Sequence, residues 1–144
     1  MEKCGRIFML NDDPIMLNMY AEFLRGHGLD VFATDNAYKM ILYAREIRPN
    51  LIILDVNIPI MNGWQVLEYL KSDVKLRSIP VVMLTMPNEV QKAIALGAAN
   101  FLLKPVEPLK LLSMVNDYCE YQINRDAWMF DKIKLNNKDD IFIK

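Results

Sequence analysis

Hydrophobic positions along the chain form two kinds of segment. Short β-branched or aliphatic runs predict strands, and three of these runs are nearly continuous, which is typical of strands buried on both faces of a sheet. The runs are Arg6–Leu10, Asp30–Ala33, Leu51–Leu54, Val81–Leu84 and Phe101–Leu103. Longer segments between them carry hydrophobic residues at helical spacing and predict amphipathic helices. These helices are expected to begin near Pro14, Asn36, Gly63 and Pro87, and after Pro105.

A strand followed by a helix thus recurs five times, which predicts an α/β fold. The expected architecture is a parallel sheet with right-handed crossovers and helices on both faces. We expect this domain to span residues 5–122. Residues 123–144 do not continue the pattern and form a C-terminal extension of unknown role. The extension could dock on the domain, form a small hairpin or mediate association, so a homodimer stays open.

Composition narrows the class of protein. Hydrophobic residues make up 53% of the 144 positions, which is enough for the packed core of one domain. The 17 Lys and Arg nearly balance the 18 Asp and Glu, so we expect no direct nucleic-acid binding and no membrane binding. No signal peptide or membrane-spanning run is recognisable. Cys4 and Cys119 are interpreted as free thiols, and the location as cytoplasmic.

Polar side chains stand at the ends of four predicted strands. Asp12 and Asp13 follow the first strand, Asp55 ends the third, Thr85 ends the fourth and Lys104 ends the fifth. Open parallel α/β sheets bind ligands at the carboxyl ends of their strands. We therefore expect these five side chains to meet at one rim.

This combination favours phosphoryl chemistry on a carboxylate. Three neighbouring carboxylates cannot all stay ionised without a cation, and Mg²⁺ prefers oxygen ligands. Lys104 adds a positive charge that suits phosphate, and covalent aspartyl phosphate is a known nucleophilic role of Asp. Each residue also has an ordinary structural interpretation; Asp12 and Asp13, for example, could simply cap the first helix. Their joint occurrence at four strand ends argues against coincidence.

On these residues the chain resembles the response-regulator receiver family of two-component signalling, over about residues 5–122. The matching motifs keep the family's order and are Asn11–Pro14, Leu54–Gly63, Val81–Thr85, Leu96–Ala98 and Phe101–Pro105. The resemblance implies a doubly wound, flavodoxin-like (βα)5 fold with strand order 2-1-3-4-5.

The resemblance also implies a role for each matched residue. Asp55 corresponds to the phospho-acceptor. Asp12 and Asp13 resemble the acidic pair that binds Mg²⁺ directly and through water, and the main-chain carbonyl of Asn57 resembles a further ligand. Lys104 is similar to the lysine that pairs with the phosphoryl group.

Two further positions are similar to the family's switch. Thr85 resembles the hydroxyl that moves onto the phosphoryl group, and Phe101 matches the aromatic residue that changes position with it. The Lys104–Pro105 peptide is cis in this family, and an X-Pro bond is where a cis peptide is least unfavourable.

The function implied is a Mg²⁺-dependent transfer of a phosphoryl group to Asp55 from a histidine kinase or phosphotransfer protein. Such a domain phosphorylates and dephosphorylates itself but turns over no separate substrate, so it is not a conventional enzyme. No DNA-binding, cyclase or phosphodiesterase module is recognisable after it, and we expect output through a downstream protein partner.

Three alternatives are weighed against this interpretation. A degenerate receiver would act as an interaction module without phosphorylation, but the five site residues are intact. A phosphohydrolase of the haloacid-dehalogenase type needs a second acid where this chain has Asn57. A flavodoxin needs a phosphate loop rich in glycine and hydroxyl groups, and this chain has the acidic pair Asp12-Asp13 there.

Two of the departures from the family's pattern, one at a single residue and one in the length of a segment, bear on function. Met86 stands where members usually have a small residue, at the backbone N–H that contacts the phosphoryl group. Its side chain could shield the aspartyl phosphate from water, which predicts slow hydrolysis. The segment from Thr85 to Gly97 is about one helical turn shorter than usual, so an output surface or dimer borrowed from relatives does not transfer directly.

Overall fold

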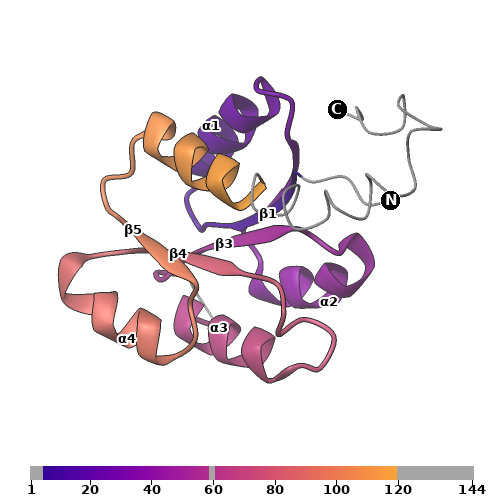
Figure 1. Cartoon of the computed structure of the whole chain (residues 1–144), viewed down its shortest axis with the longest axis vertical. Helices are drawn as coiled ribbons and strands as arrows, with labels where there is room; N and C mark the ends of the chain where they lie inside the picture. Colours follow the sequence, from indigo (N-terminus) through magenta and orange to yellow (C-terminus); the bar gives the residue numbers. More distant parts are fainter. Residues whose placement is uncertain (1–4, 59–60, 120–144) are drawn as a thin grey trace, which may run out of the picture.

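Five parallel strands form one sheet in the computed structural model, which describes residues 5–58 and 61–119. The sheet order is β2-β1-β3-β4-β5, which confirms the predicted fold class and strand order (Figure 1). The strands are β1 (Arg6–Leu10), β2 (Asp30–Thr34), β3 (Leu51–Asp55), β4 (Val81–Thr85) and β5 (Asn100–Leu103). Each lies within one residue of its predicted bounds. Cys4 and the predicted extension over 123–144 lie outside the described residues.

Helices cover both faces of the sheet (Figure 1). They are α1 (Pro14–Arg25), α2 (Ala37–Ile47), α3 (Gly63–Ser72), α4 (Val90–Ala95) and a helix over residues 108–119. The first and last pack on one face, and α2, α3 and α4 pack on the other. Within the two described ranges, no helix has the length and hydrophobicity needed to cross a membrane.

The fourth helix differs from a regular helix starting at Pro87. Residues Pro87–Glu89 form a 3-10 turn, η1, and only six residues, Val90–Ala95, are α-helical. This region is therefore short, as the spacing between Thr85 and Gly97 predicts.

Local side chains explain why three helices begin where they do. The Asp13 carboxylate accepts hydrogen bonds from the N–H groups that start α1, and Asn36 accepts one from Lys39 at the start of α2. Asn62 and Gln65 form a reciprocal capping box at the start of α3. Each cap satisfies N–H groups that have no acceptor inside the helix.

The two central strands, β3 and β4, are buried at every position. Their alternate side chains enter two separate hydrophobic clusters, one under each helical layer. This confirms that the continuous apolar runs mark strands covered on both faces. Asp55 and Thr85 are thus the last residues of two strands that are buried along their whole length.

Gly63 fixes the chain that follows Asp55. A Cβ atom at Gly63 would lie 2.4 Å from the Asp55 carbonyl oxygen and 2.8 Å from the Val56 Cα. The Gly63 N–H also donates to the Val56 carbonyl at 2.9 Å. The start of α3 therefore packs directly on the backbone at the end of β3, and only glycine fits there.

We expect Gly63→Ala to lower the free energy of unfolding by about 1–3 kcal/mol, because the new methyl group must displace backbone. The measurement is urea denaturation, with the Asp55 amide shift as a local probe. Gly26→Ala is the matched control, since its Cβ would come no closer than 3.4 Å to any heavy atom and Gly26 already has a helical φ of −63°. It should change stability by at most about 1 kcal/mol. Equal losses in the two variants would contradict the close approach.

Candidate functional site

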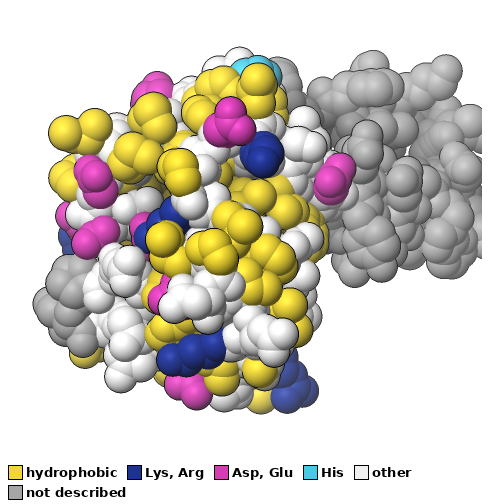
Figure 2. Space-filling model, turned by 90° about the vertical axis from the view of Figure 1, so that its left-hand side faces the viewer, with side chains coloured by type: hydrophobic (Ala, Val, Ile, Leu, Met, Phe, Trp, Pro, Cys, Tyr) yellow, Lys and Arg dark blue, Asp and Glu magenta, His cyan; other side chains and the backbone are white. Residues whose placement is uncertain are grey.

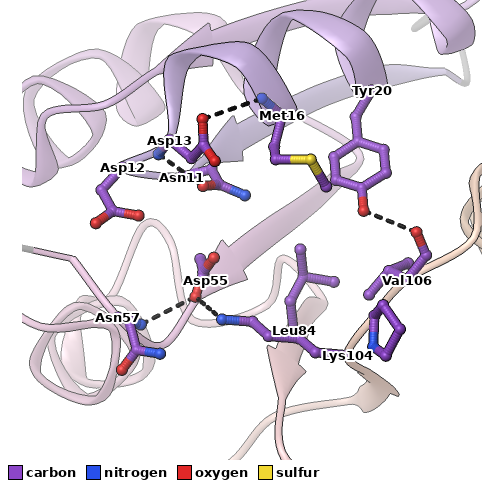
Figure 3. A pocket seen from close by; sticks show the side chains of 11 residues that line it. Asn11, Asp12, Asp13, Met16, Tyr20, Asp55, Asn57, Leu84, Lys104 and Val106 are labelled. Carbon is purple, nitrogen blue, oxygen red and sulfur yellow. Dashed lines mark hydrogen bonds and ion pairs between the residues drawn. The ribbon is translucent and has the colours of Figure 1, made fainter.

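The carboxyl ends of the strands surround a pocket of about 280 Å³. Figure 2 faces this edge of the molecule and shows acidic and basic side chains close together among hydrophobic ones. The lining residues come from α1, from β3 and β4, and from the segments that follow β1, β3 and β5 (Figure 3). They are Asn11, Asp12, Asp13, Met16, Tyr20, Asp55, Asn57, Leu84, Lys104, Pro105 and Val106.

An ion pair between Asp55 and Lys104 stands at the centre of this pocket. The Lys104 Nζ lies 2.6 Å from the Asp55 Oδ1, which also accepts the Asn57 N–H at 2.9 Å. Asp55 is only 5% exposed. A buried carboxylate is strongly unfavourable unless it is paired and hydrogen-bonded, and both conditions are met here. The carboxylate is therefore held in one orientation at the end of β3.

The segment that carries Lys104 is positioned by β4. The Lys104 N–H donates to the Thr85 carbonyl at 2.9 Å, which extends the β4–β5 pairing by one bond. The Lys104–Pro105 peptide is cis.

The two acidic residues after β1 lie differently. Asp12 is exposed and its carboxylate points into the pocket, on the side of Asn57 (Figure 3). The Asp13 carboxylate points towards α1, where its Oδ1 accepts the N–H groups of Ile15 and Met16 at 3.0 and 3.3 Å. Asp13 therefore caps the first helix, which is one of the roles that the sequence allowed for Asp12 and Asp13.

The oxygen atoms around the pocket suit Mg²⁺, an ion that needs only a few protein ligands. Among residues 5–58 and 61–119, no three His, Cys, Asp or Glu side chains are grouped to hold a metal ion. Mg²⁺ does not need such a group, because it keeps several waters and is usually bound by one or two carboxylates. Asp12, Asp55 and Asn57 line one pocket and carry oxygen atoms, which are ligands of the kind that Mg²⁺ prefers.

Three predicted residues do not line the pocket. Thr85 is buried, and its hydroxyl donates to the Met86 carbonyl at 2.6 Å rather than pointing at Asp55. Met86 is 46% exposed, and Phe101 is half-buried on β5. The structure thus brings Asp12, Asp13, Asp55, Asn57 and Lys104 together and leaves the proposed switch residues outside.

Tyr20 is a pocket residue that the sequence analysis missed. It is 2% exposed, and its hydroxyl donates to the Val106 carbonyl at 2.7 Å (Figure 3). Burial, and then the negative charge of Asp55, raise the pKa of the phenol above its ordinary value. The sequence did carry a signal for this role. Tyr20 places a hydroxyl in the hydrophobic stripe of the first helix, and a buried tyrosine hydroxyl usually has a hydrogen-bond partner.

Comparisons of the sequence with a family model and with curated proteins agree on one family. The family model of the response regulator receiver domain matches residues 7–116. The chain is 34% identical over 113 residues to the DNA-binding response regulator MtrA of Mycolicibacterium smegmatis, covering 76% of this chain and 48% of that relative. It is 29% identical over 138 residues to the probable transcriptional regulator ycf29 of Porphyra purpurea, covering 94% and 64%. The chain thus spans about half the length of the MtrA relatives.

Solved structures agree with this match. A signal receiver domain of a histidine kinase from Syntrophus aciditrophicus superposes with a TM-score of 0.74 at 30% identity, covering 81% of this chain and 90% of that chain. The chemotaxis response regulator CheY4 of Vibrio cholerae superposes with a TM-score of 0.74 at 25% identity, covering 81% and 99%.

We expect Tyr20→Phe to lower the free energy of unfolding by about 1–2 kcal/mol, because it leaves the Val106 carbonyl without its donor. Urea denaturation measures the loss. Tyr38→Phe removes a hydroxyl from an exposed tyrosine on α2 and should leave stability unchanged. A loss of the same size in Tyr38→Phe would show that the Val106 contact is not responsible.

The raised pKa of Tyr20 gives this contribution a pH dependence. The protonated phenol stabilises the fold, so the difference between wild type and Tyr20→Phe should be constant below about pH 9. Above the unfolded-state pKa of 10.0 it should shrink, and it should vanish as pH rises through the higher folded-state pKa. A difference that grows with pH would have the wrong sign.

Proposed function

Because this chain belongs to the response regulator receiver domain family, we propose that Asp55 is the residue that accepts a phosphoryl group. Receiver domains are signalling modules of two-component systems rather than enzymes in the usual sense. The observation that carries the proposal is the buried Asp55 carboxylate, paired with Lys104 at 2.6 Å in a pocket that Asp12 also lines.

The proposed donor is the phosphohistidine of a histidine kinase or phosphotransfer protein. An oxygen of the Asp55 carboxylate attacks phosphorus, a P–O bond forms, and the P–N bond breaks with its electron pair leaving on the imidazole nitrogen. Lys104 remains protonated and neutralises charge on the phosphoryl oxygens. Rate enhancement in such a transfer comes mainly from positioning and charge stabilisation.

The proposed cofactor is Mg²⁺. Asp12, Asp55 and the main-chain carbonyl of Asn57 would hold it directly, and Asp13 would contribute through water. When bound, the ion supplies positive charge that neutralises the carboxylates and the incoming phosphoryl oxygens. Support comes from the oxygen chemistry of these pocket-lining groups.

Phosphorylation adds roughly −1.5 to −2 charges beside Lys104. We propose that the Thr85 hydroxyl then leaves the Met86 carbonyl and donates to the phosphoryl group, while Phe101 turns inward. The change is a shift between two populations.

The proposed output is a changed protein-contact surface near α4 and β5. Ile94 on α4 is 56% exposed and Leu103 on β5 is 44% exposed, so this side already presents apolar groups. We propose that a downstream protein partner binds this surface. The alternative is a second copy of the chain. MtrA is named as DNA-binding, but the match to this chain covers only 48% of its length. The near-balanced charge supports our proposal that this chain does not itself contact nucleic acid, in a cytoplasmic setting.

The deciding experiment is a titration with beryllofluoride and Mg²⁺, a mimic of the aspartyl phosphate. We expect saturable amide shifts at Asp55, Thr85 and Phe101 in wild type and none in Asp55→Asn. Asp35→Asn is the control, because Asp35 is an exposed acid that follows β2 and does not line the pocket. It should respond as wild type does. No response in wild type would favour the degenerate receiver.

Met86→Ala tests the phosphate lifetime. If Met86 shields the aspartyl phosphate from water, the alanine variant should lose phosphate several-fold faster than wild type. The measurement is phosphate release after phosphorylation with a small phosphodonor. Ile94→Ala removes an exposed side chain of α4 and should not change the rate. An unchanged rate in Met86→Ala would refute the shielding role.

A further inference from the structure

The loop between β4 and α4 satisfies its own polar groups. The Met86 N–H donates to the Glu89 Oε1 at 3.0 Å, and the Glu89 N–H donates back to the Met86 carbonyl at 2.9 Å. The same carbonyl accepts the Thr85 hydroxyl at 2.6 Å. The two donors at the start of this loop are therefore both engaged within the loop.

These two donors are the ones that the proposed function requires for the phosphoryl group. The resemblance to receiver domains puts the Met86 N–H and the Thr85 hydroxyl against that group. One N–H makes one good hydrogen bond, so it cannot serve the Glu89 carboxylate and a phosphoryl oxygen together. The two acceptors are also both anions and repel each other at close range.

We propose that the Glu89 carboxylate is an internal competitor that the phosphoryl group must displace from the Met86 amide. This inference rests on the proposed phosphorylation of Asp55. It adds a residue four positions after Thr85 that sets how readily the phosphorylated state forms. Glu89 thereby holds the loop in the form that keeps the Thr85 hydroxyl away from the pocket.

The displacement has a consequence for α4. Glu89 ends the 3-10 turn that leads directly into the six residues of α4, a helix too short to be stable by itself. Loss of the reciprocal Met86–Glu89 contact removes the anchor at the start of this helix. Its remaining described contacts include buried Ala93 and Lys92, whose Nζ lies 4.7 Å from the centre of the Trp64 ring. Release of Glu89 therefore links the phosphoryl group to the α4 surface.

A purely structural role for Glu89 predicts the opposite result. If Glu89 only caps the loop, its removal loosens the site and leaves ligand affinity unchanged or lower. If Glu89 competes, its removal frees the Met86 amide and affinity rises. The direction of the change therefore separates the two roles.

The experiment uses the full chain with Glu89→Ala and Glu89→Gln. Without ligand, the Met86 amide proton should move upfield in Glu89→Ala, because it loses its acceptor. In a beryllofluoride titration with Mg²⁺, Glu89→Ala should bind roughly three- to tenfold more tightly than wild type. Glu89→Gln keeps an acceptor without the charge and should lie between the two.

Glu46→Ala is the matched control for net charge, because Glu46 is an exposed acid on α2. It should bind beryllofluoride as wild type does. If wild type binds and neither Glu89 variant binds more tightly than Glu46→Ala, the competitor role is overturned while the proposed function stands. If wild type itself does not bind, the proposed function fails. The ligand-free Met86 shift still tests the contact, and Glu89→Gln covers any folding defect of the alanine variant.

Discussion

The buried carboxylate of Asp55 imposes the main constraint on this domain. It sits at the end of a central strand that is buried throughout, where an unpaired charge would be strongly unfavourable. Lys104 supplies the opposite charge at 2.6 Å, from a segment 49 residues further along the chain. The pair can form only if β3, β4 and β5 are adjacent and in register. The strand pairing that builds the core therefore also sets the geometry of the site.

The register meets that requirement on both sides of β4. Asp55 pairs with Leu84, Thr85 pairs with Leu103, and the Lys104 N–H then reaches the Thr85 carbonyl. Each helical layer adds a support from its own face. Gly63 packs on the backbone after Asp55, and Tyr20 holds the Val106 carbonyl from α1. Contacts from both helical layers therefore support the pocket and keep the Asp55–Lys104 ion pair in a fixed position.

Periodicity was enough to predict the strands and the parallel sheet, and the strand ends were enough to predict four of the five rim residues, because these depend on local pattern and on a small set of allowed topologies. The strand order came from the resemblance to the receiver family, and Thr85 lies outside the pocket. The sequence indicated the short fourth helix only as a spacing difference, since the 3-10 turn depends on local bonds at Met86 and Glu89. Tyr20 and Glu89 escaped because their partners are main-chain groups whose position no side-chain pattern reveals. The sequence allowed Asp13 either to cap the first helix or to serve the rim. The direction of its carboxylate shows that Asp13 caps α1.

A two-state switch is favoured when its polar groups have partners in both states, because a buried donor such as the Thr85 hydroxyl costs about 1–3 kcal/mol when it has no acceptor. The β4–α4 loop supplies the first set of partners from within itself: the Met86 carbonyl for the Thr85 hydroxyl, and the Glu89 carboxylate for the Met86 amide. A phosphoryl group on Asp55 would supply the second set with its oxygens. Exchange of one set for the other leaves the number of hydrogen bonds nearly unchanged, so the two states differ by a small free energy. The charge that phosphorylation would add at Asp55 is then expected to shift the population, and we propose Glu89 as the residue that sets the starting balance.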